Sequence, residues 1–128
     1  MDVKTQRVLL TSAARTATTA CALQTDKSQQ ALRVYLNITA ASGTGGLKVL
    51  IRGYDKVSGN AAQLNGGGAA AIVATGTYVY EMMPSAGTAV GGVLETVSRL
   101  LPVQWDVQVT HGDASSYTYS VSCDVLPL

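Results

Sequence analysis

The chain has 128 residues and a net charge of +1, with 13% charged and 47% hydrophobic residues. Its charged fraction is about half of the average for soluble domains. The basic residues are scattered singly, so they form no cationic run of the kind that binds phosphate backbones. No apolar stretch reaches the roughly 20 residues that span a bilayer. We therefore expect one domain that binds neither nucleic acid nor membrane.

The N-terminal part is the least periodic region of the sequence. Residues 1–7 lack the apolar stretch of a signal peptide, which predicts synthesis in a cytoplasm. A short apolar run at 7–11 predicts a strand, whereas residues 11–28 are rich in Ala, Thr and Ser. We interpret residues 1–28 as a strand and an extended arm that becomes ordered against a partner, and residues 29–128 as the body.

Four segments of the body alternate between apolar and polar residues: 31–39, 47–54, 102–110 and 116–125. This period of two is typical of strands that bury one face. The side chains expected to anchor the core are Trp105, Val107, Val109, Val34, Leu36, Ile38, Val49, Ile51 and Val121.

Weaker strand patterns occur at 69–74 and 76–82, and Gly-rich and Asn-rich turns separate the segments. The pattern predicts an all-β, single-domain antiparallel β-sandwich or jelly-roll-like fold of about seven to eight strands with little helix. The best helix candidate is 91–100, ended by Pro102, although a loop with one helical turn fits the same residues.

No motif predicts catalysis, a cofactor or a metal ion, and we expect a protein that is not an enzyme. His111 and Asp113 lie in one turn, which is interpreted as the cap of a hairpin rather than an acid–base pair. Cys21 and Cys123 are expected to be free, buried thiols. The glycines after Asn65 lack the lysine of a phosphate-binding loop and predict a flexible hairpin tip.

The aromatic residues are six tyrosines and one tryptophan. Tyrosines on strands pack in cores and interfaces, although they also stack on sugars. The residues expected at an interface are Arg15, Tyr78, Tyr80, Met82 and Met83.

Six segments together resemble a family of small structural proteins from the virions of tailed bacteriophages. They are residues 10–19, 37–40, 49–59, 74–80, 101–113 and 117–121, and the likeness rests on their order and spacing. The resemblance implies a β-sandwich protein of the virion with no catalytic residues to transfer.

Proteins of this kind decorate or cement capsids, usually as trimers where capsomers meet. The resemblance therefore implies a homotrimer on the capsid surface, with the major capsid protein or other virion proteins as partners. One alternative is a tail-tube, head-completion or adaptor protein of the virion. A second is a carbohydrate-binding β-sandwich module that uses Tyr78 and Tyr80.

Overall fold

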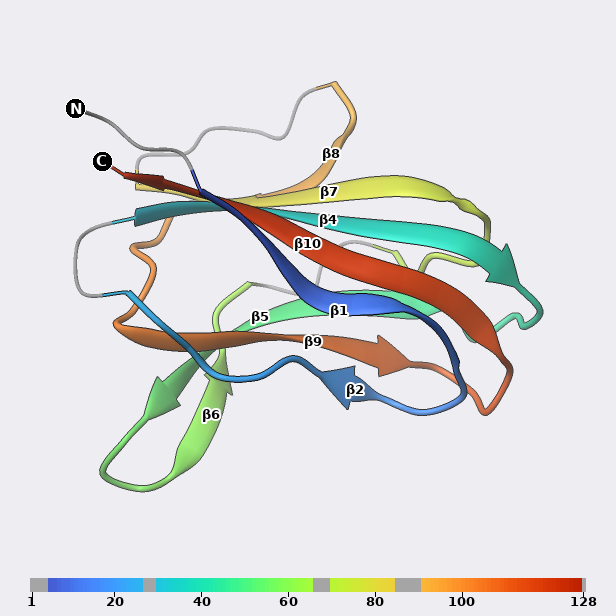
Figure 1. The fold of residues 1–128 in the computed structure, drawn as a ribbon, viewed down its shortest axis with the longest axis horizontal. Helices are drawn as coiled ribbons and strands as arrows, with labels where there is room; N and C mark the ends of the chain where they lie inside the picture. Colours follow the sequence, from blue (N-terminus) through green and yellow to red (C-terminus); the bar gives the residue numbers. More distant parts are fainter. Residues whose placement is uncertain (1–4, 27–29, 66–69, 85–90, 128) are drawn as a thin grey trace.

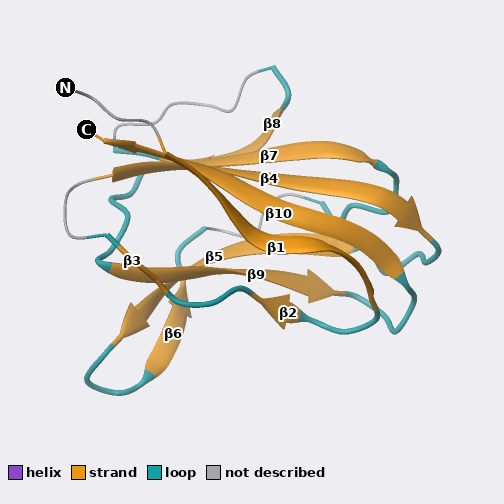
Figure 2. Ribbon diagram, viewed as in Figure 1, coloured by secondary structure: helices purple, strands orange, loops and turns teal. Residues whose placement is uncertain are grey.

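A computed structural model describes residues 5–26, 30–65, 70–84 and 91–127, and these form strands and no helix (Figure 2). The strands of the described residues are β1 (Thr5–Arg15), β2 (Thr19–Ala20), β3 (Gln24–Thr25), β4 (Gln30–Ala41), β5 (Leu47–Asp55), β6 (Asn60–Gln63), β7 (Gly76–Met82), β8 (Val93–Val97), β9 (Gln104–His111) and β10 (Tyr117–Pro127). The prediction of an all-β fold is therefore confirmed.

The strands form two sheets that face each other (Figure 1). The first sheet has the order β1-β10-β4-β7-β8, and the second has the order β2-β9-β5-β6, with β3 also paired to β9. Pairing is antiparallel except between β7 and β8. The β5–β6 hairpin projects away from the first sheet at one end of the molecule (Figure 1).

The core lies between the two sheets and contains the side chains selected by alternation. From the first sheet it includes Leu32, Val34, Leu36, Ile38, Tyr80, Met82, Tyr117, Tyr119, Val121, Cys123 and Val125, and from the second sheet Leu47, Val49, Ile51, Trp105, Val107 and Val109. Their polar neighbours in sequence point outward, because successive side chains of a strand lie on opposite faces.

The segment expected to be an arm belongs instead to the sandwich over residues 5–26. β1 pairs with β10 along its whole length, and β2 and β3 pair with β9. Arg7 donates to Asp26 at 2.6 Å and 3.0 Å, and the indole Nε1 of Trp105 donates to the same carboxylate at 2.9 Å. This cluster joins the edge of the first sheet to the second, so the segment finds these hydrogen-bonding partners within its own chain. Residues 1–4, 27 and 28 lie outside the described residues.

Asp26 is ionised within this cluster. The hydrogen bond from Arg7 is the largest cause that lowers the pKa of Asp26, and the bond from Trp105 adds to it, while burial opposes both. A carboxylate held by three charge-assisted or neutral donors is a stronger tie than an exposed ion pair.

Several local predictions were wrong. Residues 93–97 form β8 rather than a helix, and they pair with β7, where Val93 and Val97 suit a pleated surface. Residues 70–74 contribute only an isolated bridge between Ile72 and Leu47, not a strand. β6 was not predicted, because its sequence Asn-Ala-Ala-Gln has no apolar alternation.

Two turn predictions also need correction. The turn at His111 is not the cap of a hairpin, because β9 and β10 belong to different sheets and the turn crosses between them. Asn65 is not at a flexible tip: it is 2% exposed, and its side chain binds the backbone of β5. Residues 66–69 lie outside the described residues.

Candidate functional site

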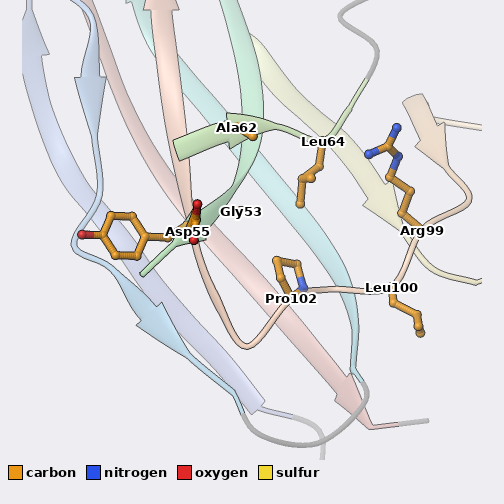
Figure 3. A pocket seen from close by; sticks show the side chains of 8 residues that line it. Gly53, Asp55, Ala62, Leu64, Arg99, Leu100 and Pro102 are labelled. Carbon is orange, nitrogen blue, oxygen red and sulfur yellow. The ribbon is translucent and has the colours of Figure 1, made fainter. Parts of the chain in front are cut away.

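An apolar groove of about 570 Å³ lies beside the β5–β6 hairpin (Figure 3). It is lined by Gly53, Tyr54, Asp55, Ala62, Leu64, Arg99, Leu100 and Pro102. The β5–β6 hairpin and Leu64 form one wall of the groove, and Arg99, Leu100 and Pro102 form the other. Gly53 permits the close approach: a Cβ atom there would lie 3.2 Å from Pro102 Cγ.

Two further depressions adjoin this groove, one smaller than it and one larger. One of about 380 Å³ shares Tyr54 and Pro102 with it, and another of about 700 Å³ shares Leu64 and Arg99. Leu100 is 52% exposed and Val103 is 54% exposed along the same rim. Because partly exposed apolar side chains gather here over a continuous surface, this end of the sandwich suits contact with another protein.

Charge at the groove favours contact rather than acid–base chemistry. The carboxylate of Asp55 accepts from Val57 N and Ser58 Oγ in the hairpin turn, and the Ser58 bond is the first cause that lowers its pKa. Lys56 and Arg99 form no salt bridge within the described residues. The groove therefore has apolar walls, a carboxylate already used by the turn, and the Arg99 guanidinium at its edge, while Lys56 lines an adjoining depression.

His111 lies in a second polar cluster at the opposite end of β9. Its Nε2 lies 2.8 Å from the Tyr119 hydroxyl, and its ring meets Tyr117 edge-on at 5.7 Å. The Arg15 guanidinium lies over the Tyr119 ring at 4.7 Å. Nδ1 of His111 is buried and has no hydrogen-bond partner among the described residues. A neutral imidazole with its proton on Nε2 fits these contacts.

We expect the protein to lose stability as the pH falls below about 6.5, the ordinary pKa of histidine. Burial is the main cause that lowers the pKa of His111, the Arg15 charge adds to it, and Asp113 opposes it. The unfolded chain therefore binds this proton at a higher pH than the folded chain, so acid favours unfolding from pH 6.5 down to the lowered pKa. Chemical denaturation of the wild type and of His111→Gln between pH 7.5 and 5 measures this slope.

The His111→Gln variant should show a shallower loss of stability over that range, because glutamine does not titrate. Carboxylates such as Asp26 titrate at lower pH and affect both proteins equally. Equal slopes in the two proteins would contradict the assignment to His111.

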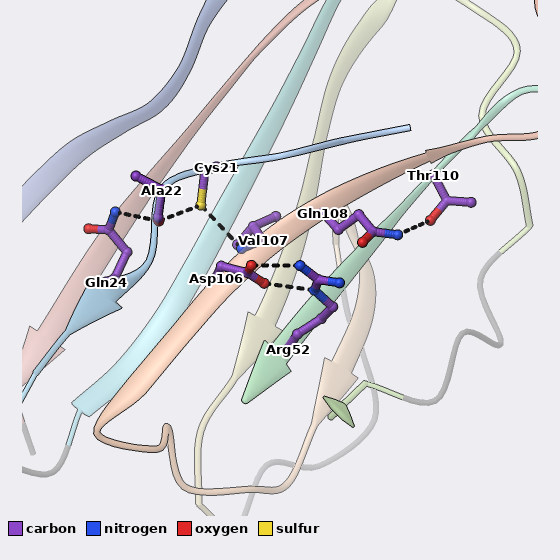
Figure 4. A network of polar contacts seen from close by, with 8 residues as sticks. All are labelled: Cys21, Ala22, Gln24, Arg52, Asp106, Val107, Gln108 and Thr110. Atoms are coloured by element: carbon purple, nitrogen blue, oxygen red, sulfur yellow. Dashed lines mark hydrogen bonds and ion pairs between the residues drawn. The ribbon is translucent and has the colours of Figure 1, made fainter. Parts of the chain in front are cut away.

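Both thiols are structural. Cys21 Sγ accepts from Val107 N and donates to Ala22 O, both at 3.2 Å, beside the Arg52–Asp106 ion pair (Figure 4). Burial raises the pKa of Cys21, and burial raises the pKa of Cys123 to about 11. Both cysteines are free and buried, as expected. Since the thiolate is the reactive form, neither is set up as a nucleophile.

The residues expected at an interface are placed differently from one another. Tyr80 and Met82 are 2% and 0% exposed, so the structure puts them in the core rather than on a surface, and burial raises the pKa of Tyr80 to about 12. Tyr78 and Met83 are half-buried. The Tyr78 hydroxyl donates to Ala74 O at 2.9 Å. Tyr78 and Tyr80 therefore form no exposed aromatic platform of the kind that stacks on sugars.

Arg15 is half-buried, and its guanidinium is hydrogen-bonded to the backbone of its own sheet. Its guanidinium donates to the carbonyl oxygens of Thr11 and Tyr119, each at 2.7 Å. These bonds lie at the register shift between Leu10 and Ala13 in the pairing of β1 with β10.

The groove was not predicted from the sequence, because Leu64, Leu100 and Pro102 are separated along the chain and share no motif.

Within the described residues, no group of three or more His, Cys, Asp or Glu side chains could hold a metal ion. The described part of the chain also has no helix that is long and apolar enough to cross a bilayer.

Comparison with protein-family models, with curated proteins and with solved structures found no match to this chain.

Proposed function

We propose that the chain is a structural protein of a tailed-phage virion that decorates the capsid and stabilises the head by bridging capsomers. The resemblance in the order of its sequence segments motivates the proposal. A protein of this kind needs a rigid body and surfaces that neighbours cover at low cost in free energy.

The observation that best supports the proposal is the pairing of charges on the outer faces of both sheets. Arg33 pairs with Glu81 across β4 and β7 at 2.7 Å, and Arg52 pairs with Asp106 across β5 and β9 at 2.7 Å. On the first sheet, Asp124 also accepts from the Tyr35 hydroxyl at 2.5 Å. Charges that are already paired within the subunit leave fewer unsatisfied groups when a neighbour covers the face.

Many shallow contacts repeated by symmetry add up to strong attachment, because each bound site raises the effective concentration at the next. The apolar groove and the paired outer faces are surfaces of this shallow kind. We expect a homo-oligomer, with a trimer as the form that matches three-fold sites between capsomers.

The test is the location and effect of the protein on particles of the phage that encodes it. We expect labelled protein at many symmetry-related sites on the head, and heads lacking it should release DNA at a lower temperature. Light scattering of the purified protein should give about three times the chain mass of 13.2 kDa. Label confined to the tail or connector would favour the tail or adaptor alternative, and no label on particles would overturn both.

A further inference from the structure

Edge strands expose unpaired backbone groups that invite another strand, and proteins usually protect them. Two register irregularities interrupt β1, and Arg15 occupies the carbonyl oxygens of Thr11 and Ala13. The strands β2 and β3 have two residues each, and a register shift interrupts β8 beside β7. Among the described strands, the edge at β1, the edge formed by β2 and β3, and the edge at β8 are therefore poor templates for pairing.

Within the described residues, the edge strand β6 has no such protection except that it is short, with four residues. It pairs with β5 without a register shift, and its sequence Asn-Ala-Ala-Gln contains no charge and no proline. All four residues are exposed. Its short length limits the strength of any added strand, but its small side chains leave the backbone accessible.

The direction of the backbone groups of β6 follows from the bonds that it makes to β5. Leu64 N donates to Ile51 O at 2.8 Å, so the backbone of Leu64 points toward β5. Backbone groups alternate along an antiparallel strand, so Ala62 also points toward β5. Ala61 and Gln63 consequently present their N–H and C=O groups outward.

We propose that β6 is a homotypic interface, at which two copies of the chain pair their β6 strands antiparallel about a two-fold axis at Ala62. In this register Ala61 of one copy faces Gln63 of the other, and each pair exchanges both backbone hydrogen bonds. Every outward N–H and C=O group of Ala61 and Gln63 is then satisfied.

The occupant is a second copy because the register is self-complementary. Ala62 lies beside Ala62 of the second copy, and Asn60 faces Leu64, so no two like charges are opposed. Ala62 also lines the apolar groove, and the two-fold axis therefore brings the grooves of both copies side by side. An isologous contact of this kind is the commonest in homo-oligomers.

This inference goes beyond the proposed function, because it concerns the chain in solution as well as in a particle. A two-fold contact is also compatible with a trimer, since it joins one trimer to the next. The contact is small, and we expect it to form at high protein concentration or on a crowded surface.

The test compares two single-cysteine variants under mild oxidation. In Ala62→Cys the Cβ atoms of the two copies face each other at about 4.5–5.5 Å, close to the separation in disulfides. In Ala61→Cys, the matched control, they are diagonal neighbours at about 7–8 Å. Both native cysteines are buried, so they contribute little background. Ala62→Cys should form covalent dimers about tenfold faster than Ala61→Cys, whereas equal rates, or no dimer from Ala62→Cys, would overturn the proposal.

Ala61→Pro supplies a second measurement that leaves the fold intact. The N–H of Ala61 points away from β5, so proline removes only a group available to a partner. In sedimentation at high concentration, the largest species formed by Ala61→Pro should have half the mass of the largest wild-type species or less. An unchanged mass would overturn the interface but leave the capsid proposal untouched, because that proposal is tested by location on the particle.

Discussion

Replacing Trp105 by alanine should lower the free energy of unfolding by about 3–5 kcal/mol, a large part of the 5–15 kcal/mol typical of a domain. The side chain is 0% exposed and is the largest in the core. Its loss leaves a cavity between the sheets and removes the indole donor from Asp26. Because Trp105 is the only tryptophan, urea unfolding should be followed by far-ultraviolet circular dichroism rather than fluorescence.

Two further variants separate packing from the polar tie. Trp105→Phe keeps most of the ring volume but removes the Nε1 donor, and it should cost about 1–2 kcal/mol. Val103→Ala changes an exposed residue two positions earlier and should stay within about 0.5 kcal/mol of the wild type. If Trp105→Ala cost no more than Val103→Ala, Trp105 would not anchor the core.

The sequence predicted the all-β class, the strands that bury one face, the strand at 76–82 and the two free, buried cysteines. β4, β5, β9 and β10 alternate over most of their length, because each faces the opposite sheet with one side and solvent with the other. The same physics selected Trp105 and Val107 correctly as buried residues. Alternation does not specify strand order, so the sequence could not predict that β1 lies beside β10 at an edge.

The failures share a cause: long-range contacts decided the local structure. Residues 93–97 have apolar spacing that fits a helix, but pairing with β7 makes them a strand. The groove is formed by residues 53, 64 and 102, which are distant in the sequence and come together only in the tertiary structure. Residues 19–25 have no period because β2 and β3 touch β9 only briefly.

Asn65 has the clearest individual role that the sequence did not reveal. Its side-chain amide extends the pairing of β5 beyond the end of β6: Oδ1 accepts from Ile51 N and Nδ2 donates to Val49 O, both at 2.8 Å. Nδ2 also donates to Glu95 of β8 at 2.7 Å, which links the second sheet to the first. A buried amide that satisfies two backbone groups and a carboxylate is expensive to remove.

We expect Asn65→Leu to lower the free energy of unfolding by about 2–5 kcal/mol, since each buried backbone group left without a partner costs about 1–3 kcal/mol. Asn60→Leu is the matched control: Asn60 is exposed at the start of β6, and the change should stay within about 0.5 kcal/mol of the wild type. Urea unfolding at pH 7 measures both. Equal stability of the two variants would show that Asn65 does not tie the sheets together.

Asn65→Asp tests the direction of the hydrogen bonds within the same tie. An ionised aspartate still accepts from Ile51 N, but it donates neither to Val49 O nor to Glu95, and it places two carboxylates together. Protonation restores one donor, so the stability difference between Asn65→Asp and the wild type should shrink as the pH falls from 7 to 5. The direction is fixed by the folded state, where the neighbouring carboxylate and burial raise the pKa of the new aspartate above its unfolded value. A difference that stays constant over this range would mean that the new carboxylate does not change its protonation between pH 7 and 5, and that Glu95 and burial do not raise its pKa as this arrangement requires.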